Sequence, residues 1–178
     1  MELSDGSQPI GNGVGPALEA RDVLRVLHGE ATAPRDLRER SLLLAGRILE
    51  FDPALRGGTG VQRAQELLES GAAARQFDRI IAAQGPLPAV PIGSLSKELP
   101  AAHDGVVTGI DCYRIARIAR MAGAPTDKGA GVDLFKKVGD PVTAGEPLYR
   151  IHAEHNTDFH FATQMADADI GFQLSERK

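Results

Sequence analysis

The order of apolar and polar positions divides the chain into a helical first part and a second part in which strands alternate with helices. Up to Gly85, apolar residues recur at intervals of three and four, which is typical of one face of an amphipathic helix. Four helices are predicted: from Pro16 to Gly29, after Pro34, from Thr59 to Gly71, and one that ends before Gly85. Thr59 and Gln62 also stand at the spacing of a capping box.

The period of the pattern changes after residue 94. Strands are predicted at Leu95–Ala102, Gly105–Ile110, Gly131–Lys136, Leu148–Ala153 and Ile170–Leu174. Two helices interrupt them, one capped by Asp111 and one capped by Asn156 or Thr157. The predicted fold class is therefore α+β, with a helical N-terminal half and a compact C-terminal module.

A connector rich in proline and glycine, residues 86–94, separates the two patterns. We therefore predict two domains, residues 1–90 and residues 91–178. The core of the second domain is expected to form around Val107, Ile110, Ile115, Ile118, Val142, Leu148 and Ile151.

Composition and charge exclude several classes of protein. Hydrophobic residues make up 42% of the chain and charged residues 25%, as in ordinary globular proteins. The net charge of −4 and the lack of a basic stretch argue against a nucleic-acid partner. No apolar stretch is long enough to cross a membrane, so no membrane partner is expected. Cys112 is the single cysteine, which excludes a disulfide within the chain and favours the cytoplasm.

Two groups of residues invite a chemical interpretation. The segment Thr126–Gly131 contains glycines and a lysine, as a phosphate-binding loop would, but its residues are not in the order of a Walker loop. We favour the alternative that it is a turn into the following strand. His152, His155 and His160 lie close together in the sequence without a zinc-protease spacing, so separate roles are expected for them.

The segment Val138–Leu148 resembles the hairpin of lipoyl and biotinyl carrier domains. Glycine and Asp-Pro residues are expected to turn the chain twice, with Val142 and Leu148 pointing inward between the turns. Carrier domains attach their cofactor to a lysine at the hairpin tip, usually in a Met-Lys context. Lys136 and Lys137 do not have that context, so the shared feature is taken to be the geometry of the fold.

Three blocks together resemble the pyrimidine nucleoside phosphorylase family, which includes thymidine phosphorylase and the AMP phosphorylases. The first block is Ser4–Gly11 continuing as Gly15–Asp22, the second is Ser70–Ala73 with Phe77 and Ala82–Gly85, and the third runs from Gly105 to Asp140. The blocks cover nearly the whole chain in the family's order. The Gly-Ala-Pro sequence of residues 123–125 and the Asp-Lys-Gly-Ala-Gly sequence of residues 127–131 are similar to the AMP phosphorylase branch.

The resemblance implies an enzyme that cleaves nucleosides with phosphate into a base and a pentose 1-phosphate. The family's phosphate-binding and base-binding motifs lie upstream of the first block and do not occur here. We therefore expect this chain to be the C-terminal part of a phosphorylase, inactive by itself, whose partner is the remainder of that phosphorylase chain. The intact enzyme would bind phosphate and a nucleoside or nucleoside monophosphate, need no organic cofactor, and form a homo-oligomer. The C-terminal module would be an α/β-hammerhead domain, a lipoyl-like barrel-sandwich.

The resemblance also implies a partial potassium site. Family members hold the ion with two backbone carbonyls of the first block and a carboxylate on the next helix, and the matching positions are Ile10, Gly13 and Asp22. Asp22 stands where the family has Glu, and Gly13 stands where it has Ala. Two interpretations of Asp22 remain open, a cation ligand or an exposed helix residue. One alternative function also remains, a non-enzymatic hammerhead module that binds a partner.

Overall fold

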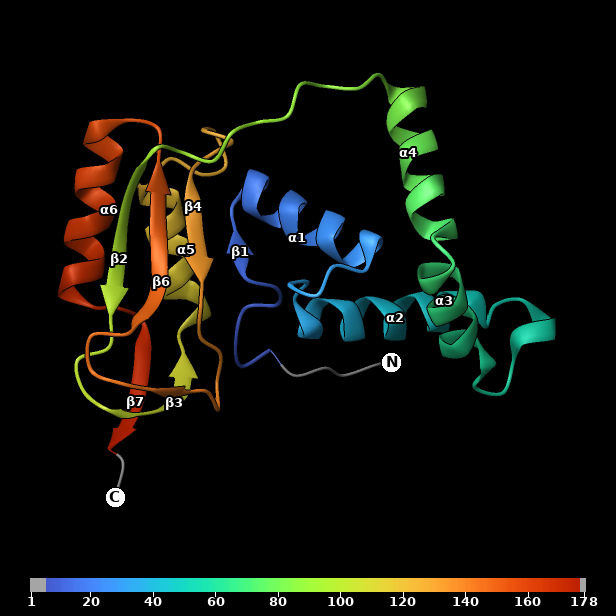
Figure 1. The fold of residues 1–178 in the computed structure, drawn as a ribbon, viewed down its shortest axis with the longest axis horizontal. Helices are drawn as coiled ribbons and strands as arrows, with labels where there is room; N and C mark the ends of the chain where they lie inside the picture. The colour runs from blue at the N-terminus through green and yellow to red at the C-terminus, as the bar shows by residue number, and fades with distance from the viewer. Residues whose placement is uncertain (1–5, 177–178) are drawn as a thin grey trace. The chain divides into compact units, whose positions relative to one another are not determined.

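The computed structural model describes residues 6–176, which form two compact units (Figure 1). One unit contains the described residues up to Ala20 together with those from Val90 onward, and the other runs from Arg21 to Ala89. The change of unit near Val90 falls in the predicted connector. Residues 6–20, however, group with the C-terminal strands, because strand β1 (Gly13–Val14) pairs with one of them. The division into domains 1–90 and 91–178 stays a prediction about the parent protein.

Two small antiparallel sheets form the unit that contains the C-terminal residues. The larger sheet has the order β1-β4-β6-β2, in which β2 is Leu95–Pro100, β4 is Gly131–Leu134 and β6 is Pro147–Ala153. The smaller sheet has the order β5-β3-β7, in which β3 is Gly105–Ile110, β5 is Pro141–Val142 and β7 is Phe172–Glu176. The five predicted strands are all present, whereas β1 and β5 are too short to show in the sequence pattern.

Helices α5 (Cys112–Met121) and α6 (Asn156–Ala168) contact each other and the larger sheet. The predicted cap of α5 is confirmed, since the Asp111 carboxylate accepts the backbone N–H of Arg114 at 2.9 Å. The predicted cap of α6 is wrong. Asn156 and Thr157 lie inside that helix, and His155 precedes it without a capping side-chain bond.

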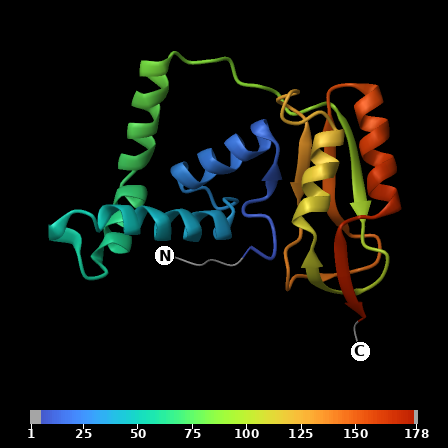
Figure 2. The same cartoon turned by 180° about the vertical axis from the view of Figure 1, so that it is seen from behind.

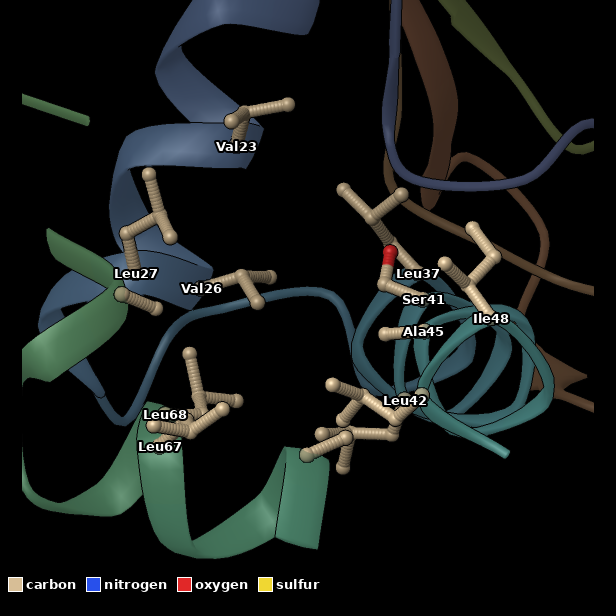
Figure 3. A pocket seen from close by; sticks show the side chains of 13 residues that line it. Val23, Val26, Leu27, Leu37, Ser41, Leu42, Ala45, Ile48, Leu67 and Leu68 are labelled. Atoms are coloured by element: carbon tan, nitrogen blue, oxygen red, sulfur yellow. The ribbon is translucent and has the colours of Figure 1, made fainter. Parts of the chain in front are cut away.

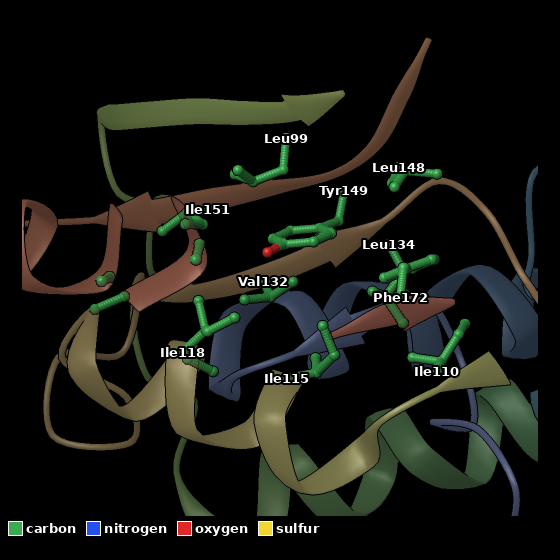
Figure 4. Close-up of a cluster of buried hydrophobic side chains, with 14 of the residues drawn as sticks. Leu99, Ile110, Ile115, Ile118, Val132, Leu134, Leu148, Tyr149, Ile151 and Phe172 are labelled. Atoms are coloured by element: carbon green, nitrogen blue, oxygen red, sulfur yellow. The ribbon is translucent and has the colours of Figure 1, made fainter. Parts of the chain in front are cut away.

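One continuous hydrophobic core holds this unit together (Figure 4). All seven residues that the sequence assigned to the core are buried there, which confirms that prediction. Leu148 and Val142 point inward, as the hairpin pattern predicted. Tyr149 lies in the middle of the cluster and stacks on Phe172, with ring centroids 5.6 Å apart. The C-terminal segments thus form a folded module with one close-packed core of their own.

The other unit is entirely helical. Its elements are α1 (Pro16–His28, which begins in the first unit), α2 (Arg35–Leu49), the 3₁₀ turn η1 (Pro53–Leu55), α3 (Thr59–Glu69) and α4 (Ala72–Gln84). Figure 2 shows this succession from behind. The four predicted helices are confirmed. The predicted capping box is wrong, because Gly58 precedes α3 and the Thr59 hydroxyl donates instead to the Leu55 carbonyl at 2.8 Å.

Glycines allow α2 and α3 to come very close. A Cβ atom at Gly60 would lie 2.1 Å from the carbonyl oxygen of Gly46, and one at Gly46 would lie 2.6 Å from the backbone nitrogen of Val61. Glycine in a helix is unfavourable by about 1 kcal/mol relative to alanine. Its presence in both helices at their contact is explained by this approach of the two backbones.

The predicted α+β class is confirmed, with helices and antiparallel sheets in one chain. Among the residues that the structure describes, no helix has both the length and the apolar character that a membrane span requires.

Candidate cation site

Ile10 and Gly13, the two predicted backbone ligands, lie on the segment that leads into and includes β1. Gly13 is the first residue of β1, and the Ile10 side chain is 44% exposed. Both residues belong to the unit that contains the C-terminal strands, whereas Asp22 lies on the part of α1 that belongs to the helical unit.

The backbone of residues 8–14 is fastened to residues 132–138. The N–H of Leu134 donates to the carbonyl of Asn12 at 2.8 Å, which continues the β1–β4 ladder by one residue. The N–H of Val138 donates to the side-chain oxygen of Gln8, also at 2.8 Å. Between these two bonds, the Lys137 ammonium donates to the carbonyls of Pro9, at 2.7 Å, and Gly11. Backbone and charge-assisted hydrogen bonds thus hold this segment at several points.

The carbonyl of Gly13 faces the outer edge of the larger sheet. Since Asn12 bonds to Leu134, the polar backbone groups of Asn12 face β4, and in an antiparallel ladder those of the next residue face the opposite way. β1 is the outermost strand of its sheet, so this direction leads away from the strands. A donor carbonyl at Gly13 is compatible with this geometry.

Glycine at position 13 is also a steric requirement. A Cβ atom there would lie 2.5 Å from the backbone carbonyl carbon of Leu18, which is far inside van der Waals contact. The family resemblance implied alanine at this position. The departure therefore reflects a closer approach of β1 to the start of α1 than an alanine would allow.

Asp22 is buried, with 1% of its surface exposed. The interpretation of Asp22 as an exposed helix residue is therefore wrong. The Arg21 guanidinium donates to Asp22 Oδ1 from Nε at 3.2 Å and from Nη2 at 3.1 Å. A buried carboxylate needs such compensation, because removing an isolated charge from water costs several kcal/mol.

The donor set at Ile10, Gly13 and Asp22 consists of oxygen atoms alone. Two neutral carbonyls and one carboxylate suit a hard cation, which prefers oxygen ligands over nitrogen or sulfur. The chemistry of the residues present thus fits potassium. The shorter Asp22 side chain and its bonds to Arg21 leave less reach and less negative charge than a glutamate without such a neighbour would offer.

The loop at residues 126–131 is not a phosphate cradle. Two of its central backbone N–H groups are already used: that of Gly129 donates to Glu154 Oε1 at 2.7 Å and that of Ala130 to the Asp127 carbonyl at 3.1 Å. The Glu154 carboxylate occupies the position that an anion would need. The Lys128 carbonyl accepts the N–H of Ala17 at 3.0 Å, in the first turn of α1. The predicted turn into a strand is confirmed, and the turn also holds the start of α1.

The three histidines are separated by the fold. His152 is buried in β6, and its Nδ1 lies 3.2 Å from the Gly93 carbonyl. His155 is exposed before α6, with Nε2 3.8 Å from Asp127 Oδ2, and His160 is exposed on α6. Across residues 6–176, no three His, Cys, Asp or Glu side chains gather as metal ligands would.

The lysines near the hairpin all make contacts with the chain itself. Lys136 pairs with Glu146 and donates to the Pro141 carbonyl at 3.3 Å, and Lys137 holds the first loop. Lys128 donates to the Pro125 carbonyl at 3.0 Å. A carrier lysine must extend into solvent, so these contacts argue against a swinging-arm function.

An apolar groove lies within the helical unit (Figure 3). It has a volume of about 400 Å³, and α1, α2, α3 and α4 all contribute side chains. Val23, Leu27, Leu37, Leu42, Ile48 and Leu68 are among the lining residues. The walls carry almost no polar atoms, which is typical of a surface that packs against another apolar surface.

Comparison with known proteins agrees with the sequence blocks. Residues 106–173 match the family of the pyrimidine nucleoside phosphorylase C-terminal domain. A protein of Rhodopseudomonas palustris named "Putative thymidine phosphorylase" is 58% identical over 173 residues, which are 97% of this chain and 34% of that protein. Proteins with the same name from Bradyrhizobium diazoefficiens and Albidiferax ferrireducens are 57% and 52% identical, over 96% and 97% of this chain and 34% of each relative. The chain thus spans about a third of the length of the curated relatives it matches, and it belongs to the pyrimidine nucleoside phosphorylase family as a part that includes the C-terminal domain.

Proposed function

We propose that this chain is the C-terminal part of a thymidine phosphorylase-type enzyme. In that reaction a phosphate oxygen forms a bond to C1′ of the pentose, the N-glycosidic bond breaks, and the base leaves after taking up a proton. The observation that carries the proposal is 58% identity, over 97% of the chain, to a protein named for this activity. The organic chemistry would be performed by residues of the other two thirds of the enzyme.

The chain itself would serve as the structural part of that enzyme. Its C-terminal module would adopt the α/β-hammerhead fold, a proposal supported by the two antiparallel sheets, the two helices packed on the larger sheet, and the lipoyl-like turns around β5. The apolar groove of the helical unit would be covered by the remainder of the phosphorylase chain. We further propose a cytoplasmic homo-oligomer, for which the single cysteine and the family resemblance are the support.

In the intact enzyme, the carbonyls of Ile10 and Gly13 and the carboxylate of Asp22 would hold a potassium ion. The ion would supply positive charge near the bound phosphate dianion. The two backbone carbonyls and the Asp22 carboxylate would supply the oxygen ligands, and the burial of Asp22 would limit the access of water to its carboxylate.

Base release from thymidine, uridine and AMP tests this function. The parent protein with phosphate should release base from at least one of them, and the 178-residue chain, purified free of host phosphorylase, should release none. Asp22→Ala in the parent should raise the potassium concentration needed for activity. If the parent releases no base while binding another protein stably, the chain is a binding module instead. Activity of the chain alone would contradict the proposed division of labour.

A further inference from the structure

We propose that Lys137 positions the 8–14 loop for the cation, so that the C-terminal domain determines how well the enzyme holds potassium. The effect on potassium binding rests on the proposed function, whereas the contacts of Lys137 are observed in the structure. The half-buried Lys137 ammonium donates to the carbonyls of Pro9 and Gly11, more than 120 positions away in the sequence. The two acceptors lie on either side of Ile10, the first proposed ligand.

Fixing those two carbonyls restricts the carbonyl between them. Each peptide unit is planar, so a hydrogen bond to a carbonyl oxygen orients the whole unit. The Pro9 and Gly11 carbonyls belong to the peptide units before and after the one that carries the Ile10 carbonyl. The Ile10 carbonyl thus belongs to a peptide unit whose two neighbouring units are both held by Lys137. Gly13 follows within the β1–β4 ladder.

Lys137 is itself mounted on a rigid turn. Its backbone N–H donates to Asp140 Oδ2 at 2.8 Å, and the N–H of Asp140 donates back to the Lys137 carbonyl at 3.0 Å. The N–H of Gly139 donates to the Val107 carbonyl at 2.8 Å, which ties the turn to β3. The position of the Lys137 backbone is therefore set by the C-terminal domain and not by the loop that its side chain holds. Charge-assisted hydrogen bonds of this kind are stronger than neutral ones.

Lys136 provides a matched control. It carries the same charge one residue earlier, but its ammonium contacts Glu146 and the Pro141 carbonyl within the hairpin. Lys137→Met and Lys136→Met thus remove the same charge and keep similar side-chain volume, while only the first loses the bonds to the Pro9 and Gly11 carbonyls.

The experiment compares both variants in the parent protein by two readouts. The first is amide hydrogen exchange of the peptide that covers residues 8–14, which should be about tenfold faster in Lys137→Met than in Lys136→Met. The second readout is the response to potassium, measured as activity and as Tm. Potassium chloride replaces tetramethylammonium chloride stepwise, so that the ionic strength stays constant. The potassium concentration for half-maximal activity, and for half of the potassium-induced rise in Tm, should increase about tenfold in Lys137→Met alone. The KM for the nucleoside should match that of Lys136→Met.

Each result decides the matter. Unchanged exchange at residues 8–14 would overturn the positioning role, whatever the activity. Faster exchange with an unchanged potassium response would overturn the link to the cation. A parent protein that releases no base would instead refute the proposed function, and the rise in Tm would then show whether Lys137 still governs cation binding. Faster exchange together with a weakened potassium response supports the inference.

Discussion

The two units contain equally regular elements but differ greatly in what those elements bury. In the unit with the C-terminal strands, both sheets and both helices contribute to one core, in which Ile115, Leu148 and Ile151 are fully buried. In the helical unit, the buried apolar residues are Val26, Leu42 and Ala64. Large apolar side chains of α2 and the turn after it are exposed instead, with Leu44 at 49%, Ile48 at 65% and Phe51 at 80%.

Regular helices therefore do not by themselves imply a complete fold. Most of the stability of a short helix comes from packing of its apolar face and not from propensity. The C-terminal unit contains the partners for its own faces. The helical unit exposes an apolar groove, and the chain spans only 34% of its relatives' length. The relevant partner of these helices would therefore be the rest of the phosphorylase.

Truncation of matched leucines should give the largest contrast. Leu148→Ala should lower the free energy of unfolding by about 3 kcal/mol, because Leu148 is fully buried and a cavity would remain. Leu44→Ala should change it by about 0.5 kcal/mol or less, because Leu44 is already half exposed. Urea denaturation followed by circular dichroism measures both. Equal losses for the two variants would contradict the comparison.

A methyl group at the contact of α2 and α3 should destabilise the helical unit alone. Gly60→Ala would place a Cβ atom 2.1 Å from the Gly46 carbonyl oxygen, and the helices would have to separate. We expect a loss of about 2 kcal/mol. The measurement is hydrogen exchange by mass spectrometry, in which α2 and α3 should lose protection while β6 keeps it. Gly6→Ala, where no atom lies within 4 Å of the added methyl group, serves as the control.

The sequence predicted the secondary structure well because hydrophobic periodicity is local. All four helices of the first part and the seven named core residues follow from spacing of apolar side chains, and the fold agrees with each. Caps were less predictable, since they depend on the exact first residue of a helix. Asp111 caps α5 as predicted, whereas Thr59 and Asn156 each begin their helix and cannot cap it.

The candidate site was predictable only in part. The resemblance pointed to Ile10, Gly13 and Asp22, but no local pattern showed that Asp22 is buried beside Arg21. Lys137 was missed because its contacts with Pro9 and Gly11 join residues from the two ends of the chain. The lysine pair was visible in the sequence, but its sequence neighbours suggested only a comparison with carrier hairpins. These long-range contacts accompany the pairing of β1 with β4. β1 is only two residues long, so no pattern in the sequence predicts it.

The surfaces of the two units should differ in their tendency to self-associate. The isolated chain should associate through the helical unit, and Ile48→Asp should weaken that association about tenfold, because it places a charge in the wall of the apolar groove. Phe161→Asp is the control, since Phe161 is 48% exposed on α6 of the other unit. Analytical ultracentrifugation over a range of concentrations gives the dissociation constants. A chain that is monomeric at all concentrations, or equal effects of the two variants, would refute the prediction.

The smallest effect at neutral pH concerns the buried hydroxyl of Tyr149. Among the described residues, Tyr149 OH and Glu50 Oε1 are buried side-chain oxygens without a hydrogen-bond partner. An unsatisfied hydroxyl loses its bonds to water on folding and gains none, so removing it is not unfavourable. Tyr149→Phe keeps the ring and its stacking on Phe172. At pH 7 the free energy of unfolding should therefore stay the same or rise by up to about 1 kcal/mol.

Tyr149→Phe should have a larger effect on the free energy of unfolding at alkaline pH, because Tyr149 is buried. Burial raises the pKa of Tyr149 above its ordinary value of 10.0, and the nearby Asp169 carboxylate adds to the shift. Above pH 10 the unfolded chain loses this proton while the folded chain keeps it, so the stability of the wild type should fall by about 1.4 kcal/mol per pH unit from this group. Tyr149→Phe should lack that fall, whereas Tyr113→Phe should keep it, because Tyr113 is 73% exposed. Urea titrations at pH 8 to 11 measure the three slopes. Parallel curves for the wild type and Tyr149→Phe would show that the Tyr149 hydroxyl reaches water or a base in the folded protein.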